Sequence, residues 1–185
     1  MNTIQERALD LFDEHGFDAV TIEQVAAASQ VSPSSVYRYF GTKEGLIVAD
    51  EFDMWSAETL AEKLDPADPV SSLLQAVQRY ETPADAATGS GASGGGPWRR
   101  VRYFFAEPSV RMAVCATLDR SARRIAPLLA SGNDLSPSQA RVVANALAFG
   151  YFAALESWFD DGGTHPIAEY VEEGLRPFRK IWPTT

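Results

Sequence analysis

The N-terminal quarter of the chain carries helix signals spaced so closely that only short helices fit between them. Apolar residues recur at helical intervals over residues 4–12, and Gly16 supplies the left-handed residue that often ends a helix. Thr21 and Gln24 then form the T-x-x-Q pattern of a capping box. The pattern therefore predicts a second, short helix over residues 21–29.

A third helix is predicted almost immediately afterwards. Ser32 can cap it, Pro33 suits the first helical position, and the helix ends near Phe40, where Gly41 closes it. Two short helices joined by a turn of three or four residues form a helix-turn-helix, whose second helix enters the major groove of DNA. Residues 21–40 therefore predict a DNA-reading element.

The predicted third helix divides its side chains between the core and the DNA. Val36 and Phe40 are expected to point inward, which leaves Tyr37 and Tyr39 outside, although the two tyrosines could also be ordinary core aromatics. Ser32 is either a helix cap or a base reader. Small hydroxyl side chains allow close approach to base edges, and cationic or phenolic groups hold phosphates. The predicted DNA contacts are Thr21, Ser32, Ser34, Ser35, Tyr37, Arg38, Tyr39 and Lys43.

The rest of the chain also has a helical pattern, with no convincing period-two strand, so the predicted fold class is all-α with about nine helices. Residues 82–96 are mostly Gly, Ser and Ala, which predicts a mobile loop. The predicted domains are 1–46 for DNA binding and 47–185 as a larger helical domain. The remaining helices are expected over residues 42–64, 68–80, 97–107, 108–129 with a possible break at Pro127, 136–159 and 166–181.

Composition excludes several classes of function. A single cysteine, Cys115, rules out an internal disulfide, and His15 and His165 lie far apart, so we expect neither a metal nor a cofactor. We find no membrane-spanning stretch, phosphate loop or Ser/His/Asp arrangement, which predicts a cytoplasmic protein that is not an enzyme. The net charge of -9 opposes indiscriminate binding to nucleic acid, so any DNA docking depends on a local basic surface.

One stretch, ALDLFDEHGFDAVTIEQVAAASQVSPSSVYRYFGTKEGL, resembles the DNA-binding domain of the TetR family of transcription regulators. The resemblance covers residues 4–46 and implies that Thr21, Ser34, Ser35, Tyr37, Tyr39 and Lys43 lie at the DNA. One departure is Gln30, which occupies a turn position where family members commonly have glycine. A residue other than glycine is strained at positive φ.

The last two predicted helices carry small residues beside aromatic ones. In proteins that resemble TetR, two such helices from each protomer form a four-helix interface, which implies a homodimer. The alternative is that these residues form a core within one protomer. The predicted interface residues are Val143, Leu147, Gly150, Ala154, Trp158, Tyr170, Val171, Gly174 and Phe178.

The resemblance also implies an apolar effector pocket between the middle helices, with Cys115 as a wall residue or, alternatively, a reactive sensor. Seven arginines between Arg99 and Arg124 form either a salt-bridged surface or a site for an anionic ligand. The stretch WRRVRYFFAEPSVRMAV is similar to a TetR subgroup with acyl-CoA-like ligands. The predicted pocket residues are Trp55, Leu74, Trp98, Phe104, Phe105, Met112, Cys115, Leu118, Phe149 and Phe152.

These features together predict a ligand-responsive repressor. It would bind a pseudo-palindromic operator in double-stranded DNA as a homodimer and be released by a small hydrophobic or amphipathic effector. Activation from the same scaffold stays open. The alternative from another functional class is a DNA-bound interaction protein that recruits a partner without sensing a small molecule.

Overall fold

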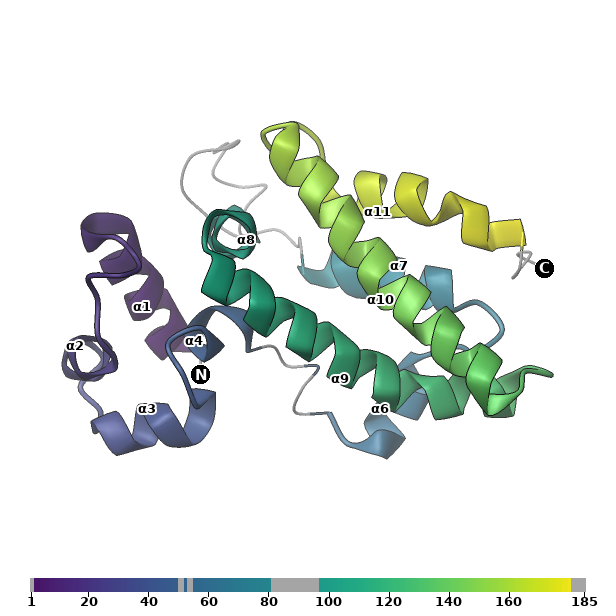
Figure 1. Ribbon diagram of the computed structural model, residues 1–185, viewed down its shortest axis with the longest axis horizontal. Helices are drawn as coiled ribbons and strands as arrows, with labels where there is room; N and C mark the ends of the chain where they lie inside the picture. Colours follow the sequence, from purple (N-terminus) through teal and green to yellow (C-terminus); the bar gives the residue numbers. More distant parts are fainter. Residues whose placement is uncertain (1, 50–51, 53–54, 81–96, 181–185) are drawn as a thin grey trace.

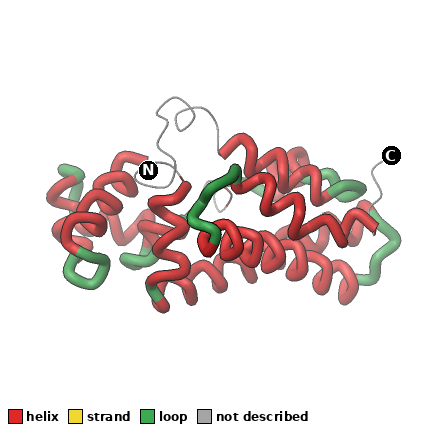
Figure 2. The backbone as a smooth tube through the Cα atoms, turned by 90° about the horizontal axis from the view of Figure 1, so that it is seen from above, coloured by secondary structure: helices red, strands yellow, loops and turns green. Residues whose placement is uncertain are grey.

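The computed structural model describes residues 2–49, 52, 55–80 and 97–180. Within these residues all regular secondary structure is helical, with no strand, which confirms the predicted all-α class (Figures 1 and 2). The helices are α1 (Asn2–His15), α2 (Ile22–Ala28), α3 (Pro33–Phe40), α4 (Gly45–Val48), α6 (Ala57–Lys63), α7 (Pro69–Tyr80), α8 (Pro97–Ala106), α9 (Pro108–Gly132), α10 (Pro137–Asp160), α11 (Ile167–Leu175) and the 3-10 helix η1 (Arg176–Lys180).

Helices α1 to α4 gather at one end of an elongated molecule, and we call this part the head (Figure 1). The other helices form the body. The two long helices of the body are α9 and α10, and α10 packs against both α9 and α11. Helices α11 and η1 run toward the end of the molecule that is far from the head (Figure 1). The predicted helix-turn-helix is therefore presented at one tip.

Local capping explains why the helices of the head are short. Thr21 and Gln24 make both hydrogen bonds of a capping box at the start of α2, as predicted. Ser32 caps α3 by accepting a hydrogen bond from the backbone N–H of Ser35, and Pro33 occupies the first turn. Gly41, with a φ of 72°, follows the last residue of α3. These contacts confirm the predicted starts of both helices.

The turn between α2 and α3 is a Schellman motif closed by Gln30. The Val31 N–H donates to the Ala26 carbonyl over 3.0 Å, and the Gln30 N–H donates to the Ala27 carbonyl over 3.1 Å. Gln30 has a φ of 55°, in the left-handed region that L-residues avoid. The head therefore keeps the geometry of a glycine turn and stores strain at one residue.

Glycine at position 30 should relieve this strain. We expect Gln30→Gly to raise the free energy of unfolding by about 0.5 kcal/mol, because the relief of left-handed strain exceeds the entropy that glycine loses on folding. Urea denaturation of both proteins measures the difference. A destabilised variant would show that the Gln30 side chain contributes more than its backbone strain costs.

The predicted helix over residues 42–64 is wrong as one continuous element. Helix α4 ends at Val48, and Ala49 is extended, with a ψ of 129°. Helix α6 starts afresh after Ser56, whose side chain accepts a hydrogen bond from the Thr59 N–H. The segment between these two helices connects the head to the body.

Side chains from distant helices donate hydrogen bonds to described backbone carbonyls of this segment. Gln5 Nε2 donates to the Ala49 carbonyl over 3.0 Å, and Arg100 donates to the same carbonyl over 3.0 Å. Arg124 on α9 donates to the carbonyls of Phe52, over 2.8 Å, and Trp55. The connecting segment is thus held from α1, α8 and α9 at once.

Two further predicted elements differ from the structure, and one cannot be compared. Helix α9 continues through Pro127 without the possible break. The last predicted helix, 166–181, is α helical only to Leu175 and continues as the 3-10 helix η1. The predicted loop over 82–96 and residue Ile181 lie outside the described residues.

The apolar core of the head extends beyond the predicted domain boundary at residue 46. Tyr103 from α8, Val110 and Val114 from α9, and Phe152 from α10 are buried in the same cluster as the apolar residues of α1 to α4. A second cluster fills the space between α7, α9, α10 and α11. The end of the body nearest the head therefore belongs to the head's core.

Helix α10 is long and apolar enough to cross a membrane by length and composition alone, contrary to the expectation from the sequence. Ala144, Leu147, Leu155 and Trp158 on this helix are buried in the second cluster. Core helices of soluble proteins pass the same test, so a single helix of this kind is weak evidence for a membrane span.

Candidate nucleic-acid interface

Helix α3 buries one side and exposes the other. Val36 and Phe40 are 0% and 8% exposed and anchor the helix on α1 and α2. Tyr37 and Tyr39 are 47% and 55% exposed, which contradicts the alternative that they are core aromatics. The rings and hydroxyls of both tyrosines are available on the outer surface of the head.

Three serine hydroxyls cluster at the start of α3. The Ser32 Oγ lies 2.9 Å from the Oγ atoms of both Ser34 and Ser35, and it also accepts the Ser35 N–H. Ser32 therefore acts as a helix cap, as one of the two predicted roles requires. Thr21 likewise caps the start of α2, where its Oγ1 accepts the Gln24 N–H over 3.3 Å.

The polar side chains in the second half of α3 contact α2 or one another. The Tyr37 hydroxyl lies 3.5 Å from the Glu23 carboxylate on α2. The Arg38 guanidinium lies 4.9 Å from the centre of the Tyr39 ring, and its Nη2 donates to the Tyr39 hydroxyl over 3.4 Å. Hydroxyl, phenol and guanidinium groups thus share one exposed surface.

Lys43 binds the loop that precedes α2. Its Nζ donates to the Phe17 carbonyl over 2.8 Å and to the Asp18 carbonyl over 3.4 Å, and lies 4.3 Å from the centre of the Phe17 ring. Sequence reasoning expected an ammonium that reaches for phosphate and did not foresee these partners. The ammonium fixes the turn between α1 and α2 relative to the end of α3.

Removal of this ammonium should affect both stability and binding. We expect Lys43→Met to lower the free energy of unfolding by about 1 kcal/mol, because a partly exposed charged hydrogen bond is lost, and the melting temperature by about 2–4 °C. Affinity should fall alike for all DNA sequences. Thermal melting and DNA titration measure both effects, with Lys180→Met as the control. An unchanged melting temperature would contradict the structural role.

Glu44 links the head to the start of α9, and sequence reasoning missed it. Burial of the Glu44 carboxylate raises its pKa, but hydrogen bonds from its own backbone, Ser109 and Thr42 lower it by more, so the net pKa lies below the usual value of glutamate. Ser109 stands in the first turn of α9. The carboxylate is thus held ionised between the two parts of the molecule.

Asp13 is the centre of a second link between head and body. Its carboxylate accepts hydrogen bonds from Arg99 over 3.0 Å, from Arg102 and from the Tyr103 hydroxyl over 2.6 Å. Arg99 also pairs with Asp10 over 2.7 Å. Because the donors lie on α8 and the acceptors on α1, these contacts join the outer side of the head to the body.

Comparison with known proteins agrees with this geometry. Residues 4–49 match the family model described as "Bacterial regulatory proteins, tetR family", which covers the head from the first turn of α1 onward. The chain is 27% identical over 174 residues to the HTH-type transcriptional regulator HbdR of Aromatoleum sp. (strain CIB), covering 91% of this chain and 74% of HbdR. The head therefore carries a DNA-binding domain of the TetR type.

Solved structures of two transcriptional repressors share the fold. NalD of Pseudomonas aeruginosa, the secondary repressor of the MexAB-OprM multidrug efflux pump, has a TM-score of 0.56 at 22% identity and covers 97% of this chain and 94% of its own. Thermus thermophilus FadR, solved with lauroyl-CoA, has a TM-score of 0.51 at 19% identity and covers 100% of this chain and 95% of its own. The similarity extends over head and body.

The arginines between positions 99 and 124 make hydrogen bonds and ion pairs within the protein. Arg111 pairs with Glu156 over 2.7 Å, Arg123 with Asp119 over 2.8 Å, and Arg120 donates to Thr117 over 2.8 Å. Arg99 and Arg102 reach the head, and Arg100 and Arg124 hold the connecting segment. The contacts favour the salt-bridged alternative over an anion site.

The predicted pocket residues do not form one group. Met112 and Phe149 are 70% and 38% exposed, so the prediction that these two side chains line an enclosed pocket is wrong. Leu74 belongs to the second cluster and Phe152 to the cluster of the head. Trp55, Phe104, Phe105, Cys115 and Leu118 are half-buried, and the side chain of Trp98 lies outside the described residues.

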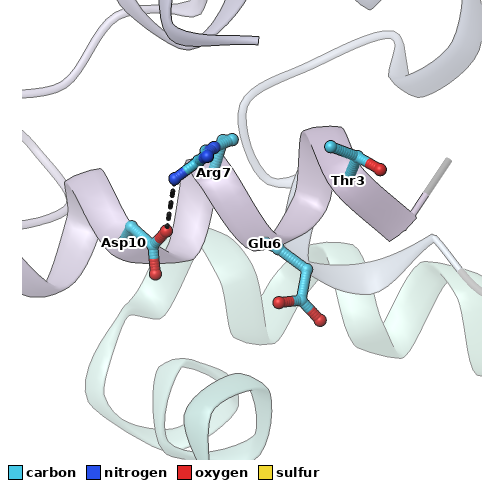
Figure 3. A pocket seen from close by; sticks show the side chains of 4 residues that line it. All are labelled: Thr3, Glu6, Arg7 and Asp10. Carbon is cyan, nitrogen blue, oxygen red and sulfur yellow. Dashed lines mark ion pairs between the residues drawn. The ribbon is translucent and has the colours of Figure 1, made fainter.

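A surface hollow lies elsewhere, along one side of α1. Figure 3 shows its lining by Thr3, Glu6, Arg7 and Asp10, and its volume is about 380 Å³. Arg7 and Asp10 pair across it over 3.6 Å. This lining is polar and includes no predicted pocket residue, so the hollow does not suit an apolar effector.

Several predicted interface residues are buried in the core of the single protomer. Leu147, Ala154, Trp158 and Val171 are at most 6% exposed and lie in the second cluster. A side chain added at Gly150 would meet Leu175 at 2.8 Å, and one added at Gly174 would meet Ala154 at 3.4 Å. The small residues therefore allow α10 and α11 of one chain to pack closely, which agrees with the alternative that they form a core within one protomer. Val143, Tyr170 and Phe178 are half-buried beside this core.

Proposed function

We propose that this TetR-family DNA-binding regulator is a cytoplasmic repressor that acts as a homodimer and leaves its operator when a hydrophobic or amphipathic effector binds. The observation that carries the proposal is the outer side of α3, where hydroxyl, phenol and guanidinium groups stand exposed on a helix anchored by Val36 and Phe40. A helix of this kind fits the major groove.

The proposed DNA contacts divide by position. The hydroxyls at the starts of α2 and α3 suit base edges and nearby phosphates, and the tyrosines suit phosphates on either side. Residues 1–46 supply these contacts, and residues 47–185 are proposed to sense the effector and dimerise. The proposed contact residues are Thr21, Ser32, Ser34, Ser35, Tyr37, Arg38, Tyr39 and Lys43.

The proposed dimer contact is an exposed apolar stripe on α10. Val142 and Phe149 are 66% and 38% exposed, and the small residues Ala146 and Ala153 fall on the same side at helical spacing. Met112, 70% exposed, stands on the neighbouring helix α9. A two-fold axis through such a stripe buries apolar surface from both copies at once.

The proposed effector site lies near the half-buried aromatics between the two clusters. Phe104 and Phe105 pack against both clusters, so they stand where the head's core meets the rest of the body. A change at α8 or α9 would pass to the connecting segment through Arg100 and Arg124. The lauroyl-CoA bound by the similar FadR supports an acyl thioester as the first ligand to test.

Selection of DNA and then of ligand tests this function. We expect the full chain to enrich a pseudo-palindromic duplex from a random pool, with half-sites about one helical turn apart. Added acyl-CoA should raise the melting temperature and release the selected duplex in the same concentration range.

The failures can be told apart. If no sequence is enriched, the chain is not an operator binder. If an operator is enriched but acyl-CoA, fatty acids and other apolar anions neither stabilise the protein nor release the DNA, the sensing part of the proposal is wrong. The protein then fits a DNA-bound interaction protein instead.

A further inference from the structure

Arg38 occupies the line along α3 that points farthest from the core. Successive residues of an α-helix are separated by about 100°, so a residue two positions from Val36 and two from Phe40 lies on the opposite side from both. Ser34, one turn earlier, shares this line with Arg38. Tyr37 and Tyr39 flank it. In the major groove, Ser34 and Arg38 would therefore face the base edges, and Tyr37 and Tyr39 would face the phosphates on either side.

The charge of Arg38 is available, unlike that of the other cations of the head. The sequence places three basic residues before residue 47: Arg7, Arg38 and Lys43. Arg7 pairs with Asp10 over 3.6 Å, and Lys43 donates to the Phe17 carbonyl. Among the residues that the structure describes, no carboxylate lies within ion-pair distance of Arg38. Its partner there is the neutral Tyr39.

The contact with Tyr39 orients the guanidinium without using all of its donors. The guanidinium carbon lies 4.9 Å from the ring centre, and one nitrogen donates to the phenol oxygen. Arginine has five N–H groups in a planar fork, so several remain for an outside acceptor. A stacked guanidinium also loses less conformational freedom when it binds.

We propose that Arg38 reads one guanine in each operator half-site, donating two hydrogen bonds to the O6 and N7 atoms of the base. This inference rests on the proposed operator binding. Guanine presents these two acceptors side by side in the major groove, and their spacing matches the arginine fork. Arg38 is thus a specificity-determining residue, whereas Tyr37 and Tyr39 position the helix on the phosphates.

The test compares base preference with general affinity. Operators are first selected with the wild-type chain, and the binding of wild type and Arg38→Ala is then measured on all single-base variants. We expect Arg38→Ala to lose the preference for guanine at one position of each half-site, a preference of about ten- to a hundredfold. Affinity for unrelated DNA and its dependence on salt should change little.

An altered base separates direct reading from other effects. Replacement of the guanine by 7-deazaguanine removes the N7 acceptor, so it should weaken wild type and leave Arg38→Ala unaffected. Arg38→Lys should keep the charge and only part of the preference, because an ammonium can donate to the same acceptors but lacks the planar fork. Arg120→Ala removes a cation from α9 and should keep the full preference for guanine.

Two outcomes overturn the inference. A uniform loss on every sequence, with a shallower dependence on salt, would make Arg38 a phosphate contact. Equal sensitivity of wild type and Arg38→Ala to 7-deazaguanine would assign the guanine to another residue. In both cases operator binding by the wild-type chain still stands. Failure of the wild type to select any sequence would instead remove the proposed function itself.

Discussion

Arginine in place of Phe149 should separate the proposed dimer into folded monomers and lower operator affinity by about a thousandfold. Phe149 is 38% exposed on the apolar stripe of α10, so the protomer tolerates a longer polar side chain there. In the dimer the same guanidinium would be desolvated without a partner. Each head would then bind alone with half of the contacts, which brings its affinity toward that for non-specific DNA, about a thousandfold or more below that of a specific complex.

Sedimentation velocity and DNA titration measure this prediction. Ala61→Arg, at an exposed position of α6, adds the same charge away from the stripe and should leave the dimer intact. Circular dichroism checks that both variants stay folded. A folded Phe149→Arg variant that remains dimeric would place the interface elsewhere. Gly150→Arg cannot test the dimer interface, because Gly150 faces Leu175 of its own chain.

Alanine at position 45 should destabilise the head by about 3 kcal/mol or more, at the upper end of the cost of overpacking. The added Cβ would lie 1.9 Å from the Phe40 carbonyl oxygen and 2.9 Å from its carbon. Both are backbone atoms, so no rotamer change relieves the overlap. Helix α4 would have to move away from the end of α3, together with the buried side chains of Leu46 and Ile47.

Gly162→Ala is the matched control for this substitution. Gly162 has a φ of 73°, but no atom lies within 4 Å of an added Cβ. Its replacement should cost only the backbone strain of a left-handed alanine, about 1–2 kcal/mol. Urea denaturation of both variants compares the two costs. If Gly45→Ala is the milder change, α4 adapts without loss and its close approach to α3 is not required.

The caps of the head could be predicted because their signals are local. Thr21 and Gln24, or Ser32 and Pro33, stand within a few residues of the bonds that they make. The break after Val48 could not be predicted in the same way. The donors that satisfy its carbonyls come from Gln5, Arg100 and Arg124, some 40 to 70 positions away.

The same difference between local and long-range contacts decides which features of the candidate site could be predicted. Burial of Val36 and exposure of Tyr37 follow from helical periodicity, and the structure has both. The engagement of Lys43 by the Phe17 carbonyl depends on how two helices meet, which periodicity does not describe. For Gly150, composition correctly indicated close helix approach but not whether the approaching helix belongs to the same chain.

The shared core of head and body sets a rule for building hybrid regulators. A graft that joins residues 1–46 to a foreign effector module would separate the head from Val110, Val114 and Phe152, which complete its packing. It would also leave Asp13 without its donors on α8. A working chimera of this protein must exchange the matching surfaces of α8, the first turns of α9 and the part of α10 around Phe152 together with helices α1 to α4, so the unit to exchange is discontinuous in sequence.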